Sequence, residues 1–163
     1  MTTPTAISEI ASAEGGWPVG FPDVGTLERL ALRLAQGARH EQEVETILKP
    51  AAKTTVEDLL GCQGIALCSP EYFGTMAGMI KDFFDRSYEA ARERTIGLPY
   101  VLVVCAGNDG RGALTQMERI IAGYKWRKAL EHERIVGPPT EEDLQRIEDL
   151  GHALAAGLAM GIF

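Results

Sequence analysis

The sequence predicts an α/β domain in which helices cover both faces of an open parallel sheet. Two uncharged runs, Gly64–Cys68 and Pro99–Ala106, have the continuous apolar character of strands that are buried on both faces. A loop and then a segment with helical periodicity follow each run. Strands that alternate with helices in this way form βαβ units, and the full order of predicted elements is α, β, α, β, α, β, α, β, α.

Length and composition indicate one domain over residues 1–163, with an irregular N-terminal segment over residues 1–25 that is rich in glycine and proline. A net charge of −7 argues against nucleic acid and anionic membranes as partners. The start of the chain has no signal-peptide pattern. The longest apolar stretch of the chain, Leu150–Phe163, is too short to span a bilayer, so we expect a cytoplasmic protein. Cys68 and Cys105 lie inside apolar runs and are expected to be small buried hydrophobic residues.

The first half of the chain predicts two helices and an edge strand. A helix begins at Thr26, a suitable N-cap, because apolar residues then recur at helical spacing. An imperfect alternation over Val44–Leu48 predicts an edge strand. Thr54 and Glu57 have the spacing of a capping box, so a short helix is expected over Thr54–Gly61.

The second half predicts three further helices and a last strand. After the loop that begins at Ser69, an apolar stripe predicts a helix: Met76, Met79, Ile80, Phe83, Phe84 and Tyr88. Another helix runs through Ala113 and Ile121, Glu133–Gly137 predicts a strand, and Thr140 caps a final helix.

Two loops at the carboxyl ends of strands are candidates for chemistry, since ligands of such sheets bind there. Pro70 has no amide hydrogen, which predicts that the strand ends before the first loop, Ser69–Gly78. The second loop, Ala106–Gly112, offers amide donors for the polar edge of a heterocycle. Each loop alone is also explained as ordinary turn chemistry. The three histidines are scattered without metal-ligand spacing, so no metal site is expected, and no hydrolase triad is visible.

The segments Ser69–Gly78, Lys81–Arg86 and Val103–Gly112 resemble the flavodoxin-like superfamily, in particular its flavodoxin and NADPH-dependent FMN reductase branch. The resemblance implies a three-layer fold with strand order 2-1-3-4-5 and an FMN ring held between the loops that follow the third and fourth strands. The residues implied on the two sides of the ring are Pro70, Glu71, Tyr72, Phe73 and Gly74, and Gly107, Asn108, Asp109 and Gly110.

The N-terminus departs from the pattern of the superfamily. Its first strand would fall over residues 14–20, where the chain reads EGGWPVG, unless residues 6–12 replace that strand. In the following phosphate loop, Pro22 lacks an amide donor and Asp23 is negatively charged, which leaves Gly25 and Thr26 as the suitable residues. FMN binding is therefore a conditional expectation.

The resemblance implies an FMN-binding oxidoreductase or electron carrier that uses NAD(P)H, similar to FMN or quinone reductases and acting on a small-molecule redox substrate or a redox protein. The alternative is a protein of this fold that has lost FMN and serves as a binding or assembly module, with the tail over residues 152–163 forming a homodimer contact. A phosphorylated receiver domain is disfavoured, because the third strand ends in Ser69 rather than an aspartate.

Overall fold

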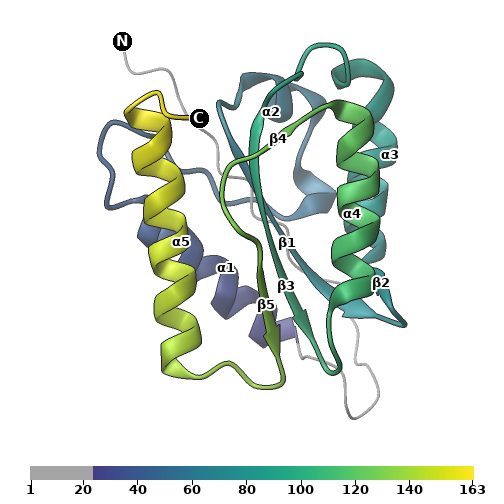
Figure 1. Cartoon of the computed structure of the whole chain (residues 1–163). Coiled ribbons are helices and arrows are strands. Elements are labelled where there is room, and N and C mark those ends of the chain that lie inside the picture. Colours follow the sequence, from purple (N-terminus) through teal and green to yellow (C-terminus); the bar gives the residue numbers. More distant parts are fainter. Residues whose placement is uncertain (1–23) are drawn as a thin grey trace.

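The computed structural model describes residues 24–163 and shows a curled sheet between two layers of helices (Figure 1). Three parallel strands lie side by side in the order β1, β3, β5, with register pairs that include Leu67 opposite Leu102 and Cys105 opposite Ile135. The short β4 also pairs with β3 in parallel, and β2 pairs with the end of β1 as an antiparallel hairpin. The strands are β1 (Ile65–Tyr72), β2 (Thr75–Met76), β3 (Pro99–Ala106), β4 (Arg127–Lys128) and β5 (Glu133–Val136).

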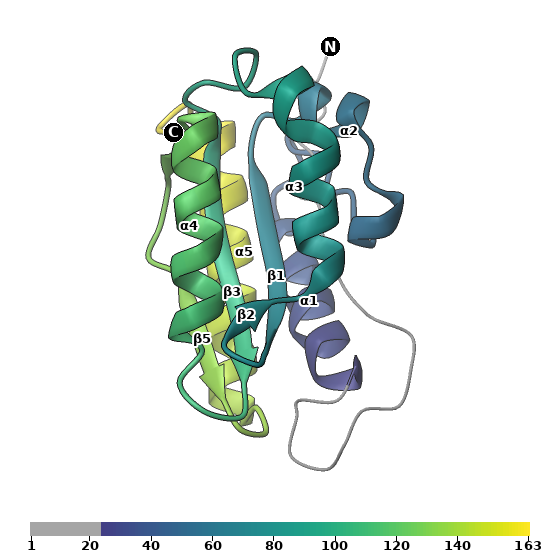
Figure 2. The same cartoon turned by 90° about the vertical axis from the view of Figure 1, so that its right-hand side faces the viewer.

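Helices α1 and α5 cover one face of the sheet, and helices α3 and α4 cover the other (Figure 2). Residues that alternate along β1 and β3 point into one layer or the other, as the pleat of a strand requires. The helices are α1 (Val24–Ala38), α2 (Val56–Gly61), α3 (Gly78–Ala91), α4 (Arg111–Tyr124) and α5 (Glu141–Ala159), with a 3₁₀ turn, η1, at Ala51–Lys53.

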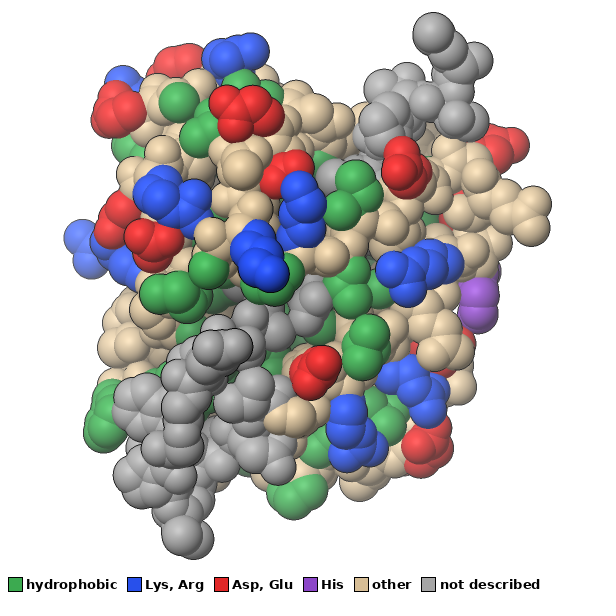
Figure 3. Space-filling view, turned by 180° about the vertical axis from the view of Figure 1, so that it is seen from behind, with side chains coloured by type: hydrophobic (Ala, Val, Ile, Leu, Met, Phe, Trp, Pro, Cys, Tyr) green, Lys and Arg blue, Asp and Glu red, His purple; other side chains and the backbone are tan. Residues whose placement is uncertain are grey.

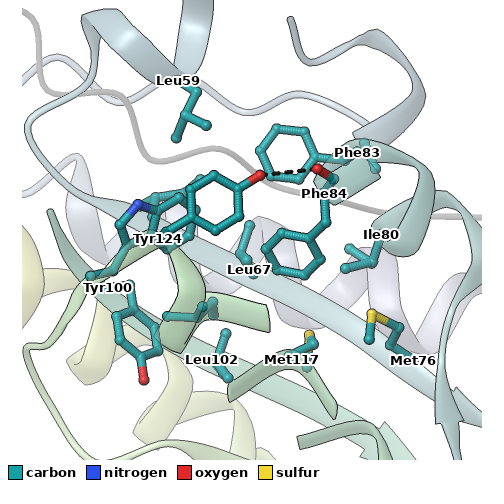
Figure 4. Packing of buried hydrophobic residues seen from close by; sticks show 14 of the residues in the cluster. Leu59, Leu67, Met76, Ile80, Phe83, Phe84, Tyr100, Leu102, Met117 and Tyr124 are labelled. Atoms are coloured by element: carbon teal, nitrogen blue, oxygen red, sulfur yellow. Dashed lines mark hydrogen bonds between the residues drawn. The ribbon is translucent and has the colours of Figure 1, made fainter. Parts of the chain in front are cut away.

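The core between the sheet and α3/α4 is rich in aromatic side chains (Figure 4). Tyr124 is completely buried, and its hydroxyl donates to the carbonyl of Phe84 at 3.0 Å and lies 2.8 Å from the hydroxyl of Ser87. Burial raises the pKa of Tyr124 to about 12. The indole N–H of Trp126 donates to the Thr95 hydroxyl at 2.8 Å. The polar groups of these two large rings are therefore satisfied within the core.

The core between the sheet and α1/α5 is aliphatic and contains a very close helix contact. A Cβ atom on Gly37 of α1 would lie 1.8 Å from the carbonyl oxygen of Glu148, and one on Gly151 of α5 would lie 2.0 Å from that of Leu34. The two backbones thus touch at glycines on both helices. Arg33 adds ion pairs across this contact, at 2.9 Å to Glu148 and 2.7 Å to Glu141.

Several predictions from the sequence are confirmed. The strand Pro99–Ala106 forms with all eight residues buried, and the last strand occupies Glu133–Val136. Thr140 caps α5 in a capping box with Asp143. Cys68 and Cys105 are fully buried. These features depend on strong local patterns, namely continuous apolar runs and a cap followed by acidic residues.

Two predicted helix starts are wrong by one or two residues. Helix α1 begins at Val24, so Thr26 lies inside its first turn rather than at the N-cap. In α2 the N-cap is Thr55, which forms its capping box with Asp58. Thr54 is buried instead, and its hydroxyl closes the preceding 3₁₀ turn by donating to the carbonyl of Pro50 at 3.0 Å. Either threonine has an acid three residues later, so spacing alone did not separate them.

The predicted edge strand over Val44–Leu48 does not form in the described structure. Val44 and Leu48 pack on the α1/α5 core, whereas Ile47 packs on the other core, so the side chains do alternate. The backbone of this segment, however, is hydrogen bonded to no described strand. Alternation reports where side chains point, and a strand also needs a partner for its backbone.

Pro70 does not end the buried strand, because β1 continues to Tyr72 and Pro70 pairs in register with Cys105. A proline fits in a strand wherever its nitrogen faces away from the neighbouring strand. Within residues 24–163, β1 has a parallel neighbour on one side only. Met76 likewise belongs to β2, so α3 begins two residues later than its apolar stripe predicts.

The predicted first strand, over residues 14–20 or 6–12, lies outside the described residues.

Charged side chains of both signs are intermingled on the face seen from behind (Figure 3). In the part of the chain that is described, no helix is long and apolar enough to cross a membrane.

Candidate functional site

Three segments gather at the end of the sheet where β1, β3 and β5 terminate (Figures 1 and 2). They are the β1–β2 hairpin, the loop between β3 and α4, and the first turn of α1. We call this end of the molecule the carboxyl end. The sequence placed all of its candidate residues in these segments, and the fold brings the segments to one place.

The β1–β2 hairpin is a tight two-residue turn. Phe73 and Gly74 both have positive φ, at 52° and 72°, as a type I′ turn requires. The hydroxyl of Thr75 donates to the carbonyl of Tyr72 at 3.2 Å and thereby braces the turn. Phe73 is a bulky residue in a left-handed conformation, and 77% of it is exposed. The hairpin therefore presents an aromatic ring at the rim while Tyr72 stays buried.

Ser69 connects the hairpin to the start of α3. Its side chain is completely buried, accepts the N–H of Ala77 at 3.0 Å and donates to the carbonyl of Pro70 at 2.8 Å. Both capacities of the hydroxyl are used within the backbone, so Ser69 supports the shape of the site rather than offering a nucleophile.

The loop between β3 and α4 leaves Gly107, Asn108 and Asp109 exposed. Gly110 then caps α4 in a left-handed conformation, with φ of 67°, and supplies no side-chain cap. The Asp109 carboxylate accepts the N–H of Arg111 at 3.0 Å. From β5, the guanidinium of Arg134 donates to the carbonyl of Asp109, which fixes the loop from the opposite side.

The two loops are joined through Glu71 and Gly112. Glu71 is 4% exposed, and its Oε2 accepts the N–H of Ala113 in the first turn of α4 at 2.9 Å. A Cβ atom on Gly112 would lie 2.0 Å from the carbonyl oxygen of Gly74, so the hairpin and α4 touch through their backbones. Resemblance implied that Glu71 lines a ring; the structure shows its carboxylate turned to the start of α4.

The first turn of α1 supplies the third part of the site. Gly25 is exposed and Thr26 half-buried in that turn, and the turn contains no acidic residue. The N–H groups at the start of a helix are unpaired within the helix and favour an anion. Asp23, which the sequence marks as unfavourable for a phosphate, lies outside the described residues.

Sequence reasoning missed the roles of Ser69, Gly112 and Arg134. A signal was present for Gly112, because a glycine just inside a predicted helix is unfavourable unless another backbone approaches it. No local signal exists for Arg134, whose partner is 25 residues away. The opposite end of the sheet carries a hollow beside Leu59, Arg94 and Phe163, and it contains none of the predicted site residues. The described residues contain no cluster of three or more potential metal ligands.

The arrangement fits a flavin nucleotide. A flat ring needs backbone amides at its polar edge and an aromatic neighbour. The β3–α4 loop exposes Gly107, Asn108 and Asp109, and the adjoining hairpin exposes Phe73. A phosphate is favoured by the free N–H groups at a helix N-terminus, and the first described turn of α1 contains no acidic residue.

Known proteins of similar fold share this arrangement of strands and helices. An archaeal flavodoxin superposes with a TM-score of 0.79 at 19% identity, covering 94% of this chain and 98% of that one. Flavodoxin 1 from Bacillus cereus gives 0.76 at 16% identity, with coverage of 93% and 97%. A flavodoxin, WrbA-like protein from Agrobacterium tumefaciens gives 0.71 at 12% identity, with coverage of 97% and 98%. At these identities the likeness establishes the flavodoxin-like fold.

Sequence comparison points the same way. A flavodoxin from Aquifex aeolicus is 36% identical over 61 residues, a match that covers 37% of this chain and 33% of that relative. The sequence model of the NADPH-dependent FMN reductase family matches residues 9–134, which include the hairpin, the β3–α4 loop and the start of α1. This chain belongs to the NADPH-dependent FMN reductase family.

Proposed function

We propose that this protein binds FMN at the carboxyl end of its sheet and acts as an NAD(P)H-dependent oxidoreductase or electron carrier. The observation that carries the proposal is the junction of two rigid loops through Glu71 and Gly112 at the same end as the start of α1. Family membership supports the same cofactor.

The chain's own residues divide the work of holding the cofactor. Gly107, Asn108 and Asp109 are exposed residues, and their backbone amides bind the polar edge of the ring. Phe73, on the hairpin, covers the ring from the side. Gly25 and Thr26 receive the phosphate at the start of α1.

Bound FMN supplies the electron-transfer chemistry. The protein supplies a fixed site, since the hairpin and α4 are in backbone contact and Arg134 holds the carbonyl of Asp109. No side chain needs to act as nucleophile, and the buried Ser69 is engaged in two hydrogen bonds. The substrate is a small redox-active molecule or a redox protein that reaches the exposed rim beside Phe73.

The test is a titration of the purified chain with FMN, followed by flavin fluorescence, with riboflavin titrated in parallel. We expect saturable binding in the micromolar range or tighter, and weaker binding of riboflavin because it lacks the phosphate. NADPH or NADH is then added without oxygen, and bleaching of the flavin absorbance reports reduction. Absence of saturable FMN binding overturns the proposal. Binding without bleaching by either nucleotide limits the protein to an electron carrier.

A second candidate is a cofactor-free binding or assembly module. Met160 and Ile162 near the C-terminus are 68% and 62% exposed, and an apolar pair of this kind suits a contact with a second copy. This candidate predicts a stable dimer without flavin, which sedimentation measures. A monomer that binds FMN contradicts it.

A further inference from the structure

The start of α4 is capped by a side chain from a different element. Gly110 at the N-cap has no side chain to offer, and the first turn of α4 has no acidic residue. The first N–H groups of a helix need acceptors from elsewhere. Glu71 of β1, 42 residues earlier, supplies one by accepting the N–H of Ala113 at 2.9 Å.

The position of Glu71 makes this bond more than a local cap. Glu71 is the second residue before the positive-φ turn at Phe73 and Gly74, so it moves with the hairpin. Ala113 follows Gly112, whose Cβ position would lie 2.0 Å from the Gly74 carbonyl oxygen. One contact prevents the two loops from coming closer, and the buried hydrogen bond prevents them from separating. Asp109 also accepts an N–H, that of Arg111, but both residues belong to one loop.

We propose that Glu71 is a positioning residue that sets the separation of the two ring-facing loops, through its bond to the start of α4. This inference rests on the proposed function. It assigns Glu71 a role that resemblance does not give it, because its carboxylate acts on α4 rather than on the ring. If the Glu71 carboxylate is removed, the N–H of Ala113 loses its acceptor. Because an unpaired buried N–H is costly, α4 then relaxes away from the hairpin.

Two substitutions separate the acceptor from the charge. Glu71→Gln keeps an oxygen at the end of a side chain of equal length, so it can still accept from Ala113. Glu71→Ala removes the acceptor. The matched control is Thr55→Ala, which removes the cap of α2, a helix that is remote from both loops.

Two measurements follow. In the cofactor-free proteins, amide hydrogen exchange at Ala113 should accelerate by about tenfold or more in Glu71→Ala and stay near the wild-type rate in Glu71→Gln and Thr55→Ala. The dissociation constant for FMN should rise about ten- to a hundredfold in Glu71→Ala, with a changed absorbance band of the bound flavin, and stay within about threefold in the other two. Rescue by glutamine is the result that a charge effect would not give.

Unchanged exchange at Ala113 in Glu71→Ala overturns the clamp itself. Accelerated exchange with unchanged FMN affinity overturns its role in the ring site while the proposed function stands. If the wild-type chain binds no FMN, the proposed function fails, and the exchange data then show a cap only. If Glu71→Ala does not fold, Glu71→Asp replaces it, because a carboxylate shortened by one CH₂ cannot reach Ala113. Its FMN affinity should fall by about tenfold or more, and wild-type affinity in that variant overturns the inference.

Discussion

The two faces of the sheet are held to their helices by different means. Against α3 and α4, the core includes large rings with hydrogen-bonded polar atoms, namely Tyr124 with Ser87 and Trp126 with Thr95. Against α1 and α5, the core is aliphatic, and the two helices touch through glycines. The first face tolerates little loss of volume or of polar partners, and the second tolerates little gain of volume.

The difference bears on the site, because each face carries part of it. The hairpin and the β3–α4 loop precede α3 and α4, so the ring-facing loops depend on the aromatic core. The helix that offers its N-terminus to an anion is α1, whose position depends on its contact with α5. We therefore expect the aromatic face to be sensitive to substitutions that remove volume or polar partners, with effects on the ring-facing loops. We expect the α1/α5 face to be sensitive to substitutions that add volume, with effects on the anion site at the start of α1.

The largest effect is expected from Gly151→Ala on the α1/α5 face. Helix propensity alone would favour alanine by about 1 kcal/mol. The new methyl group, however, would lie 2.0 Å from the Leu34 carbonyl oxygen, and a backbone cannot yield as a flexible side chain can. We expect the free energy of unfolding to fall by about 3 kcal/mol, measured by urea denaturation. The control is Gly61→Ala, where nothing lies within 4 Å. Equal stability of the two variants would contradict the close contact.

A smaller effect is expected from Tyr124→Phe on the aromatic face. The ring remains, but the bonds to the Phe84 carbonyl and the Ser87 hydroxyl are lost. A loss of about 1–2 kcal/mol in the free energy of unfolding is expected, read from the same denaturation curves. Tyr88→Phe is the matched control, since the Tyr88 hydroxyl makes no side-chain hydrogen bond within residues 24–163. An equal loss in both variants would mean that the hydroxyl network is not what stabilises this face.

The smallest effect is a pH dependence from His132, which precedes β5 and whose ring centroid lies 5.4 Å from that of Tyr100. Its Nδ1 accepts the N–H of Leu102 at 3.1 Å, which only a neutral ring can do. Burial, followed by the charge of Lys128, lowers its pKa, and the nearby Glu118 opposes this.

The sign of the pH effect follows from proton binding. The unfolded chain binds the His132 proton more readily than the folded protein does, so stability is full above the ordinary histidine pKa of about 6.5 and falls as the pH drops below it. Denaturation midpoints at pH 7 and pH 5 should differ more in the wild-type protein than in His132→Asn. The two proteins are identical at every other residue, so the difference between their profiles reports on His132 alone. A profile in His132→Asn that is as steep as the wild-type one would rule out this role.

The sequence predicts what depends on strong local patterns. The apolar run of β3 and the cap at Thr140 were placed within a residue. The two candidate loops follow β1 and β3, as the alternation of strands and helices predicts. The fold class follows from the alternation of these elements, because parallel strands joined by helices have few other arrangements.

What the sequence does not predict depends on proximity in space. Pro70 continues a strand because of where its neighbour lies, and Gly112 is required because Gly74 approaches it. Glu71 lies next to the motif that carries the resemblance, yet its partner, Ala113, is set by the tertiary fold. The segment Val44–Leu48 alternates as an edge strand would and still pairs with no described strand.

The most direct test of the account is the FMN affinity of Gly112→Ala against that of Gly61→Ala. Both substitutions add one methyl group to a helix, but only the first would place it 2.0 Å from the Gly74 carbonyl oxygen, between the two loops. Circular dichroism first establishes that both variants are folded at the temperature of the titration. The account predicts that Gly61→Ala binds FMN as the wild-type protein does and that Gly112→Ala binds it at least about tenfold more weakly. Wild-type affinity in a folded Gly112→Ala would contradict the claim that the junction of these loops holds the flavin.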